Sequence, residues 1–159
     1  MKSASQSLLF LVKFGCSFYV LQKYGVEASV CVGPSMEPTL NAQGDIVIFE
    51  HISPRWGTLQ PGDVVVAKSP SNPHSYICKR VKVVGDKPFS SRFWKYRQRT
   101  PQYVPRGYIW LQGDNADNST DSREYGPVPE ALIVGRVFLR IWPMSQIEWI
   151  GRSPKISTS

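Results

Sequence analysis

Short runs of β-branched and aromatic residues, separated by turn residues, recur along most of this 159-residue chain and constrain its fold more than any other feature. The runs cover residues 45–49, 63–67, 76–84, 108–111, 132–134 and 136–141. Glycine-containing turns precede several of them. Many short strands at this spacing predict a mostly β fold, built as a compact antiparallel sheet or barrel.

The length of the chain predicts one domain that is large enough to have its own core. Apolar residues make up 42% of the chain and charged residues 19%, which indicates a globular rather than a disordered protein. We place the domain at residues 26–151, between an N-terminal segment (1–25) and a polar tail (152–159) that is expected to fray. Residues 87–104 are the least regular part and are expected to form a flexible insertion.

The segment Gly-Pro-Ser-Met-Glu-Pro-Thr at 33–39 holds one serine, Ser35, in a loop bounded by prolines. Pro34 and Pro38 fix their own φ angles, so the loop has few conformations to lose on folding. A serine held in this way is a candidate nucleophile. Because the hydroxyl is a weak nucleophile by itself, it needs a nearby base to take its proton.

The candidate base is Lys79, in the run 76–84, because His51 and His74 stand in no recognisable triad pattern. A lysine acts as a base only when it is neutral, and burial lowers its usual pKa of about 10.4. Alternation along a strand would point the neighbouring Arg80 to the opposite face. A purely structural alternative is that both are edge-strand charges that discourage aggregation.

Several motifs, in this order and spacing, resemble the conserved boxes of the type I signal peptidases, which are membrane-bound serine–lysine proteases. They are Ser35-Met36-x-Pro38-Thr39, the run 44–49, Lys79-Arg80-Val81, Gly113-Asp114-Asn115, Ser119-x-Asp121-Ser122-Arg123 and Tyr125-Gly126-Pro127-Val128. The resemblance covers residues 26–145. The short chain and the segments 68–73 and 77–81 are more similar to the mitochondrial inner membrane members than to the larger bacterial leader peptidases.

The resemblance implies a role for each residue of the site. Ser35 would be the nucleophile and Lys79 the general base, the hydroxyl of Ser119 would help to orient the lysine amine, and Asp121 and Arg123 would brace the site. Without the resemblance, residues 113–123 would be only a polar loop rich in side-chain-to-backbone turns.

One position departs from the pattern of several family members. They carry a hydroxyl residue two positions before the nucleophile, whereas this chain has Gly33, as some other members do. The oxyanion would therefore be bound mainly by the Ser35 backbone N–H, together with water.

The implied function is that of a membrane-bound serine endopeptidase that removes sorting peptides from proteins directed to the mitochondrial intermembrane space. The catalytic domain would face that space from the inner membrane. A second homologous protease subunit would be its partner in a heterodimer. The alternatives are a bacterial-type signal peptidase that cleaves secretory leader peptides and a non-enzymatic, lipid- or partner-binding β module.

The formal net charge of +7 is concentrated in a basic and aromatic segment at 92–99. This segment is either a solvated loop or a patch that contacts anionic lipid, since Trp, Tyr, Lys and Arg favour the membrane interface. Nucleic acid is not an expected partner, because no nucleic-acid motif accompanies the charge. No cofactor or metal is expected, because the sequence has no glycine-rich phosphate loop and no ligand cluster.

The N-terminal residues 8–21 are mainly apolar but are interrupted by Lys13, and the run is shorter than the roughly 20 residues of a usual membrane span. A short anchor and an amphipathic helix on the bilayer surface are both compatible with it. The family resemblance favours an uncleaved membrane anchor.

The chain has three cysteines, Cys16, Cys31 and Cys78, without CxxC spacing. The odd number argues against a complete disulfide framework, so they are expected to be small apolar residues. A Cys31–Cys78 disulfide in an oxidising compartment is the alternative.

Overall fold

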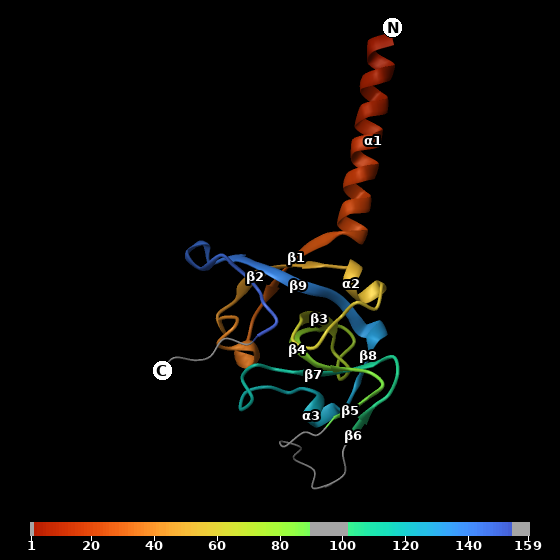
Figure 1. The fold of residues 1–159 in the computed structure, drawn as a ribbon. Helices are drawn as coiled ribbons and strands as arrows, with labels where there is room; N and C mark the ends of the chain where they lie inside the picture. Colours follow the sequence, from red (N-terminus) through yellow and green to blue (C-terminus); the bar gives the residue numbers. More distant parts are fainter. Residues whose placement is uncertain (1, 90–101, 154–159) are drawn as a thin grey trace.

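The computed structural model describes residues 2–89 and 102–153, and has one long helix followed by a β domain (Figure 1). Helix α1 (Lys2–Tyr24) extends away from the domain. The strands of the main sheet are β1 (Val26–Cys31), β2 (Asp45–Glu50), β3 (Val64–Lys68), β4 (Tyr76–Val84), β7 (Tyr108–Gln112), β8 (Val128–Pro129), β9 (Ile133–Trp142) and β10 (Glu148–Trp149). The short helices are η1 (Pro34–Met36), α2 (Ile52–Arg55), α3 (Ser122–Tyr125), η2 (Glu130–Leu132) and η3 (Met144–Gln146).

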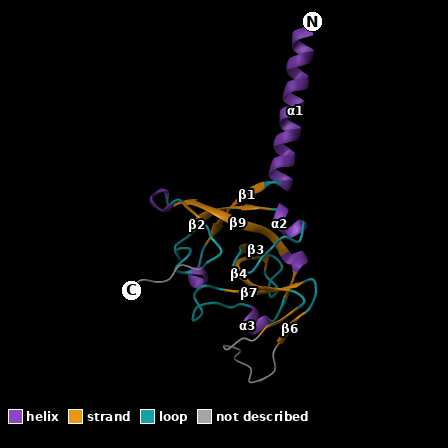
Figure 2. Ribbon diagram, in the orientation of Figure 1, coloured by secondary structure: helices purple, strands orange, loops and turns teal. Residues whose placement is uncertain are grey.

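The main sheet is antiparallel throughout, with the strand order β1-β2-β9-β3-β4-β7-β8 and with β10 paired to β9. It curls into a half-barrel, and the short helices lie in its connections (Figure 2). The predicted mostly β, antiparallel fold is confirmed. Strand β9, although late in the chain, lies between β2 and β3 and therefore joins the β1–β2 pair to the remaining strands.

The expected strands at 132–134 and 136–141 are wrong in one respect, because residues 133–141 belong to one continuous strand, β9, while Leu132 ends the short helix η2. The two expected strands left Gly135 out. Instead it lies inside the strand, where a Cβ would collide with the ring of Phe49 and lie 2.8 Å from the carbonyl oxygen of Glu50. Glycine in a strand interior often marks such a close approach between neighbours.

Strand β1 was not expected from the sequence. It lies at an edge of the sheet, paired only with β2, and its apolar residues Val26 and Val30 are exposed.

The apolar interior contains two main clusters. One includes Val65, Val81 and Leu111, and the other includes Met36 and Leu40 from the loop that carries Ser35. Met36 and Leu40 are each only 2% exposed. Burying such a side chain contributes about 1.5–3 kcal/mol, so packing as well as proline stiffness fixes this loop.

The segment 87–104, predicted to be an irregular insertion, begins and ends in paired strands. Strands β5 (Lys87–Phe89) and β6 (Gln102–Val104) form a separate two-stranded sheet. The basic segment 92–99 lies outside the described residues.

The side chains of residues 6–20 of α1 are exposed to solvent in the isolated chain. Among the described residues, none of the helices combines the length and apolar character needed to cross a membrane.

Candidate active site

The loop between β1 and β2 presents Ser35 from the short helix η1. Pro34 begins this turn, and the backbone N–H of Leu40 donates to the carbonyl of Met36 at 2.9 Å. The Gly33 backbone N–H donates to the carbonyl of Ala42 at 3.0 Å, which closes the base of the loop. Local turn geometry and the buried Met36 side chain therefore hold the serine in one position.

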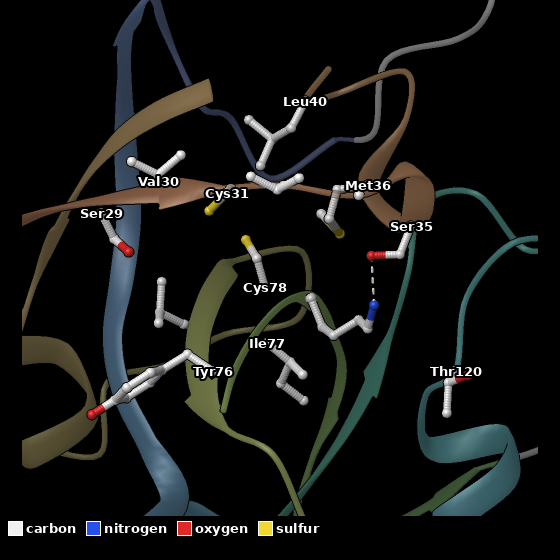
Figure 3. Close-up of a pocket in the computed structure, with 14 residues that line it drawn as sticks. Ser29, Val30, Cys31, Ser35, Met36, Leu40, Tyr76, Ile77, Cys78 and Thr120 are labelled. Atoms are coloured by element: carbon white, nitrogen blue, oxygen red, sulfur yellow. Dashed lines mark hydrogen bonds between the residues drawn. The ribbon is translucent and has the colours of Figure 1, made fainter. Parts of the chain in front are cut away.

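Strand β4 brings Lys79 to this serine from a distant part of the sequence. The Lys79 Nζ lies 2.6 Å from the Ser35 Oγ and donates a hydrogen bond to it (Figure 3). The lysine is only 5% exposed. The two residues that the sequence motifs selected as nucleophile and base are thus in direct contact.

Burial lowers the pKa of the Lys79 amine, and the nearby Arg123 lowers it further, while Asp121 acts in the opposite direction. Within the described part of the chain, no carboxylate lies within ion-pair distance of this amine. The ammonium form therefore loses hydration without gaining a direct counter-ion, which favours the neutral amine that a base requires.

The contact between Ser35 and Lys79 lies at one end of a pocket of about 300 Å³. Strand β1 and the following loop form one wall, and the first half of β4 forms the opposite wall (Figure 3). The lining residues are Ser29, Val30, Cys31, Val32, Gly33, Ser35, Met36, Leu40, Val66, Tyr76, Ile77, Cys78, Lys79 and Thr120. The pocket has both polar and apolar surface and could accept a small side chain of a peptide.

A polar loop before α3 lies on the other side of the lysine and is organised by Asp121. This carboxylate is fully buried and accepts hydrogen bonds from the Ser119 hydroxyl at 2.8 Å and from the Gly113 backbone N–H at 2.9 Å. Arg123 donates to both of its oxygens at 2.8 Å. Although burial raises the pKa of Asp121, these hydrogen bonds together lower it below its usual value.

The Ser119 hydroxyl donates its hydrogen bond to Asp121. The family resemblance of the motifs had instead implied that this hydroxyl helps to orient the Lys79 amine. Any orienting effect of Ser119 on the lysine in this conformation is therefore indirect. The contact between Asp121 and Arg123 has the geometry expected of a bracing pair.

The turn at 113–115 lies directly against the nucleophile loop. The Asn115 backbone N–H donates to the Ser35 carbonyl at 3.1 Å. A Cβ at Gly113 would collide with this same carbonyl and with the Ser119 side chain. Glycine is thus required where the polar loop and the serine loop meet.

A second buried cluster, around Arg80, was not anticipated. The guanidinium is 1% exposed, lies 2.6 Å from the Asp114 carboxylate and donates to the Thr39 hydroxyl at 3.1 Å. It also donates to the carbonyls of Gly62 at 2.7 Å and Gly151 at 2.9 Å. Thr39 in turn donates to Asp114 at 2.6 Å.

The sequence contained a signal for this cluster. Thr39, Arg80 and Asp114 each belong to a different one of the motifs quoted above, and the structure brings the three together. The predicted tail begins at Arg152, which is also attached to the domain, since its side chain bonds to Asp63 at 2.9 Å.

No group of three or more His, Cys, Asp or Glu side chains in the described ranges, 2–89 and 102–153, is arranged to hold a metal ion.

Comparison with known proteins places the chain in a family. It matches the family described as signal peptidase, peptidase S26, over residues 4–87 and 82–142. The chain belongs to this family. Resemblance to the type I signal peptidases, first suggested by the motifs, is thereby confirmed.

Curated relatives narrow the comparison further. The chain is 46% identical over 149 residues to the human mitochondrial inner membrane protease subunit 1, covering 91% of this chain and 87% of the relative. It is 41% identical over 144 residues to the mitochondrial ATP-independent inner membrane protease subunit 1a of Arabidopsis thaliana, covering 89% and 86%. It is also 36% identical over 133 residues to subunit 2 of the Saccharomyces cerevisiae protease, covering 79% and 72%.

The family and the names of these relatives support a peptidase. They favour a mitochondrial signal-peptidase-like function over the bacterial-type alternative. A non-enzymatic β module has no support from the same comparisons.

Proposed function

We propose that this protein is a serine endopeptidase with a Ser35–Lys79 catalytic dyad, and that it removes sorting peptides from proteins directed to the mitochondrial intermembrane space. The observation that carries the proposal is the 2.6 Å contact between the Ser35 hydroxyl and a buried lysine amine. A nucleophile and a base within hydrogen-bond distance, with the base held near its neutral form, are the requirements for activating a serine.

In the proposed reaction, neutral Lys79 takes the proton of the Ser35 hydroxyl as the oxygen attacks the scissile carbonyl. The lysine then gives this proton to the leaving amine, and an acyl-enzyme remains. Lys79 next takes a proton from water, and the resulting attack on the ester releases the second product and restores Ser35.

The developing oxyanion is assigned to the Ser35 backbone N–H. The Gly33 residue has no side-chain donor, and its own N–H is already bonded to Ala42. Water would supply the second hydrogen bond, as donors aimed at the oxyanion stabilise the transition state.

Asp121 and Arg123 are proposed to hold the polar loop in place beside the base, and Ser119 to act through Asp121. The hydrogen bonds from Ser119 and Arg123 fix both oxygens of the carboxylate. The negative charge of Asp121 raises the pKa of the nearby Lys79 amine. Holding the carboxylate in one position therefore keeps the size of this effect constant.

The substrate is proposed to bind as an extended peptide between β1 and the first half of β4. Strand β1 has one unpaired edge, and β7 pairs with β4 only from Arg80 onward. Unpaired backbone groups on such edges can accept an added strand, while pockets select alternate side chains. The pocket beside Ser35 would then select a side chain close to the cleaved bond.

The proposal also covers the attachment of the protein to a membrane and its partner subunit. Helix α1 would attach the protein to the mitochondrial inner membrane, with the β domain in the intermembrane space, and a second homologous subunit would form a heterodimer with it. The support is the exposed apolar side chains at Leu8, Phe10 and Phe14, together with the names of the relatives, which are subunits of inner membrane proteases.

The decisive experiment compares Ser35→Ala, Lys79→Ala and the double variant in the cleavage of a presequence peptide by the purified protein. Each single variant is expected to lose essentially all turnover, and the double variant to be scarcely worse, because the two side chains act as a unit. Lys82→Ala, on the same strand, is the matched control and should retain activity. Substantial turnover by Lys79→Ala at neutral pH would contradict the serine–lysine assignment.

Attachment to the membrane is tested separately. Removing residues 1–24 should move the protein from the membrane fraction to the soluble fraction. Full release of the intact chain by alkaline carbonate would indicate a peripheral helix instead of an inserted anchor.

A further inference from the structure

Two cysteines face each other across the pocket beside Ser35. Cys31 is the last residue of β1, and Cys78 lies in β4. These strands are separated by β2, β9 and β3 in the order of the sheet, yet its curvature brings the two side chains together. Their sulfur atoms point toward one another in Figure 3.

The two thiols lie close enough to interact, because each one shifts the pKa of the other. Both side chains pack against the apolar cluster that contains Met36 and Leu40, and both line the pocket. Two thiols that face one another from opposite walls of one pocket need only a small approach to form a bond.

We propose that Cys31 and Cys78 form a reversible disulfide that links the two walls of the pocket and blocks peptide binding. The inhibitory part rests on the function proposed above, whereas formation of the bond does not. Neither residue has a chemical role in the proposed peptide cleavage, although both line the pocket. The pair would therefore be a modification site that responds to the thiol–disulfide balance around the protein.

The chemistry is exchange with a small-molecule disulfide such as oxidised glutathione. The Cys31 thiolate attacks one sulfur of this disulfide, forms a mixed disulfide and releases one thiol. Cys78 then loses its proton and attacks the Cys31 sulfur, which closes the protein disulfide and releases the second thiol. Two protein thiols are oxidised and one small disulfide is reduced to two thiols.

The surroundings of the two cysteines suit these two steps. The hydrogen bond from Cys78 lowers the pKa of Cys31, which favours the attacking thiolate, although burial acts in the opposite direction. The same contact and the burial of Cys78 raise its pKa, so Cys78 is the residue that reacts second.

The bond would affect substrate binding because of where its two ends lie. Cys78 directly precedes Lys79, and Cys31 is followed by the loop that presents Ser35. Drawing the two walls together would narrow the space in which an extended peptide has to fit between β1 and β4.

The test exposes the full-length protein in detergent to defined ratios of reduced and oxidised glutathione. Intact mass, peptide mapping and peptide cleavage are then measured on the same samples. Wild type should lose two hydrogen masses, yield a Cys31–Cys78 cross-linked peptide and lose at least about 10-fold in kcat/KM. Dithiothreitol should restore both the mass and the activity.

Three variants separate the effect of the pair from other oxidation. Cys16→Ser, in α1, is the matched control and should behave as wild type. Cys31→Ser and Cys78→Ser, each compared with its own reduced sample, should form no internal cross-link. Cys31→Ser should also retain its activity in oxidised glutathione, because it lacks the thiol that attacks first.

The outcomes that would overturn the proposal are distinct from failure of the peptidase assignment. Recovery of only mixed disulfides with glutathione, at every ratio, would exclude the protein disulfide. A complete cross-link with unchanged cleavage would exclude the inhibitory effect. Absence of cleavage by the reduced wild type would instead contradict the proposed function, while the mass measurement would still decide whether the bond forms.

Discussion

Lys79 and Arg80 are consecutive residues of β4, both basic and both nearly excluded from solvent, yet they enter opposite surroundings. Arg80 lies against the Asp114 carboxylate and donates hydrogen bonds to several other oxygens. Lys79 points into the pocket and contacts the Ser35 hydroxyl. The surroundings of Arg80 therefore compensate its buried positive charge, whereas the surroundings of Lys79 disfavour the charged form of its amine.

The difference separates a structural cation from a candidate base. A buried ion that is paired and fully hydrogen-bonded remains charged, and losing one partner is costly. A buried amine without a direct counter-ion instead has its pKa lowered toward the range in which it can accept a proton. The surroundings, more than the residue type, thus decide which of two adjacent cations can perform chemistry.

The largest effect is expected for Lys79→Met, which removes the amine but keeps a side chain of similar length. Peptide cleavage should fall by about 10³-fold or more, because the nucleophile loses its base. The melting temperature should stay the same or rise, since the cost of burying the amine disappears. Retained activity together with a marked fall in melting temperature would mean that Lys79 is a paired structural cation like Arg80.

Asp114→Ala tests the opposite side of the strand. It leaves the Arg80 guanidinium buried without its counter-ion, so the free energy of unfolding should fall by about 3–5 kcal/mol. Denaturant unfolding measures this change. The matched control is Glu148→Gln, at a partly exposed ion pair with Arg140, where a loss of no more than about 1 kcal/mol is expected. Similar losses in both variants would remove the distinction between the two kinds of site.

A smaller effect is expected for Ser119→Ala, which removes one of the hydrogen bonds to the buried Asp121 carboxylate. The free energy of unfolding should fall by about 0.5–1.5 kcal/mol. We expect kcat to fall more than KM rises, because the change alters the surroundings of the base and leaves the pocket walls intact. An equal rise in KM with unchanged kcat would instead assign Ser119 to substrate binding.

Lys79 should also make stability depend on pH. The folded protein releases the Lys79 proton below the pKa of 10.5 that is usual for lysine, whereas the unfolded chain keeps it. Between these two pKa values the unfolded state binds more protons, so this residue makes stability rise with pH, by at most about 1.4 kcal/mol per unit. The contribution of Lys79 is the difference between wild type and Lys79→Met in the free energy of unfolding, measured as a function of pH. An opposite slope would mean that folding raises this pKa.

Peptide cleavage should also depend on the protonation of Lys79. The value of kcat/KM is expected to rise with pH through the pKa of Lys79 in the free enzyme, because only the neutral amine can act as the base. A profile that is flat across the range in which the folded amine titrates would exclude the lysine from this role.

Much of the fold and of the site could be predicted from the sequence, because the relevant signals are local. β-branched runs indicated β2, β3, β4 and β7, and the proline-bounded loop singled out Ser35. Edge strand β1 was missed although its apolar and polar residues alternate, and the strand was divided at Gly135 because only the contact of this glycine with Phe49 across the sheet explains its place. Interactions that depend on the packing of distant strands leave little local signal.

Prediction of the site was limited in the same way, because its contacts join residues that are distant in the sequence. Motifs selected Ser35 and Lys79 as candidates, but they could not say that Ser119 bonds to Asp121 in this conformation or that Cys31 touches Cys78. Arg80 was expected on the face of the strand opposite Lys79, but its partners could not be named, since they lie far away in the sequence. Pairing of this kind becomes visible only when the curvature of the sheet is known.

The place of β9 in the sheet has a consequence for when this protein can become active during its synthesis. Ser35 lies between β1 and β2, Lys79 lies in β4, and β9 is the strand that joins these two parts of the sheet. A growing chain that has not yet produced residues 133–142 therefore cannot complete the sheet that aligns serine and lysine. We expect the unfinished chain to have no proteolytic activity, so that its own partly folded segments, and other proteins nearby, are not cleaved before the domain is complete.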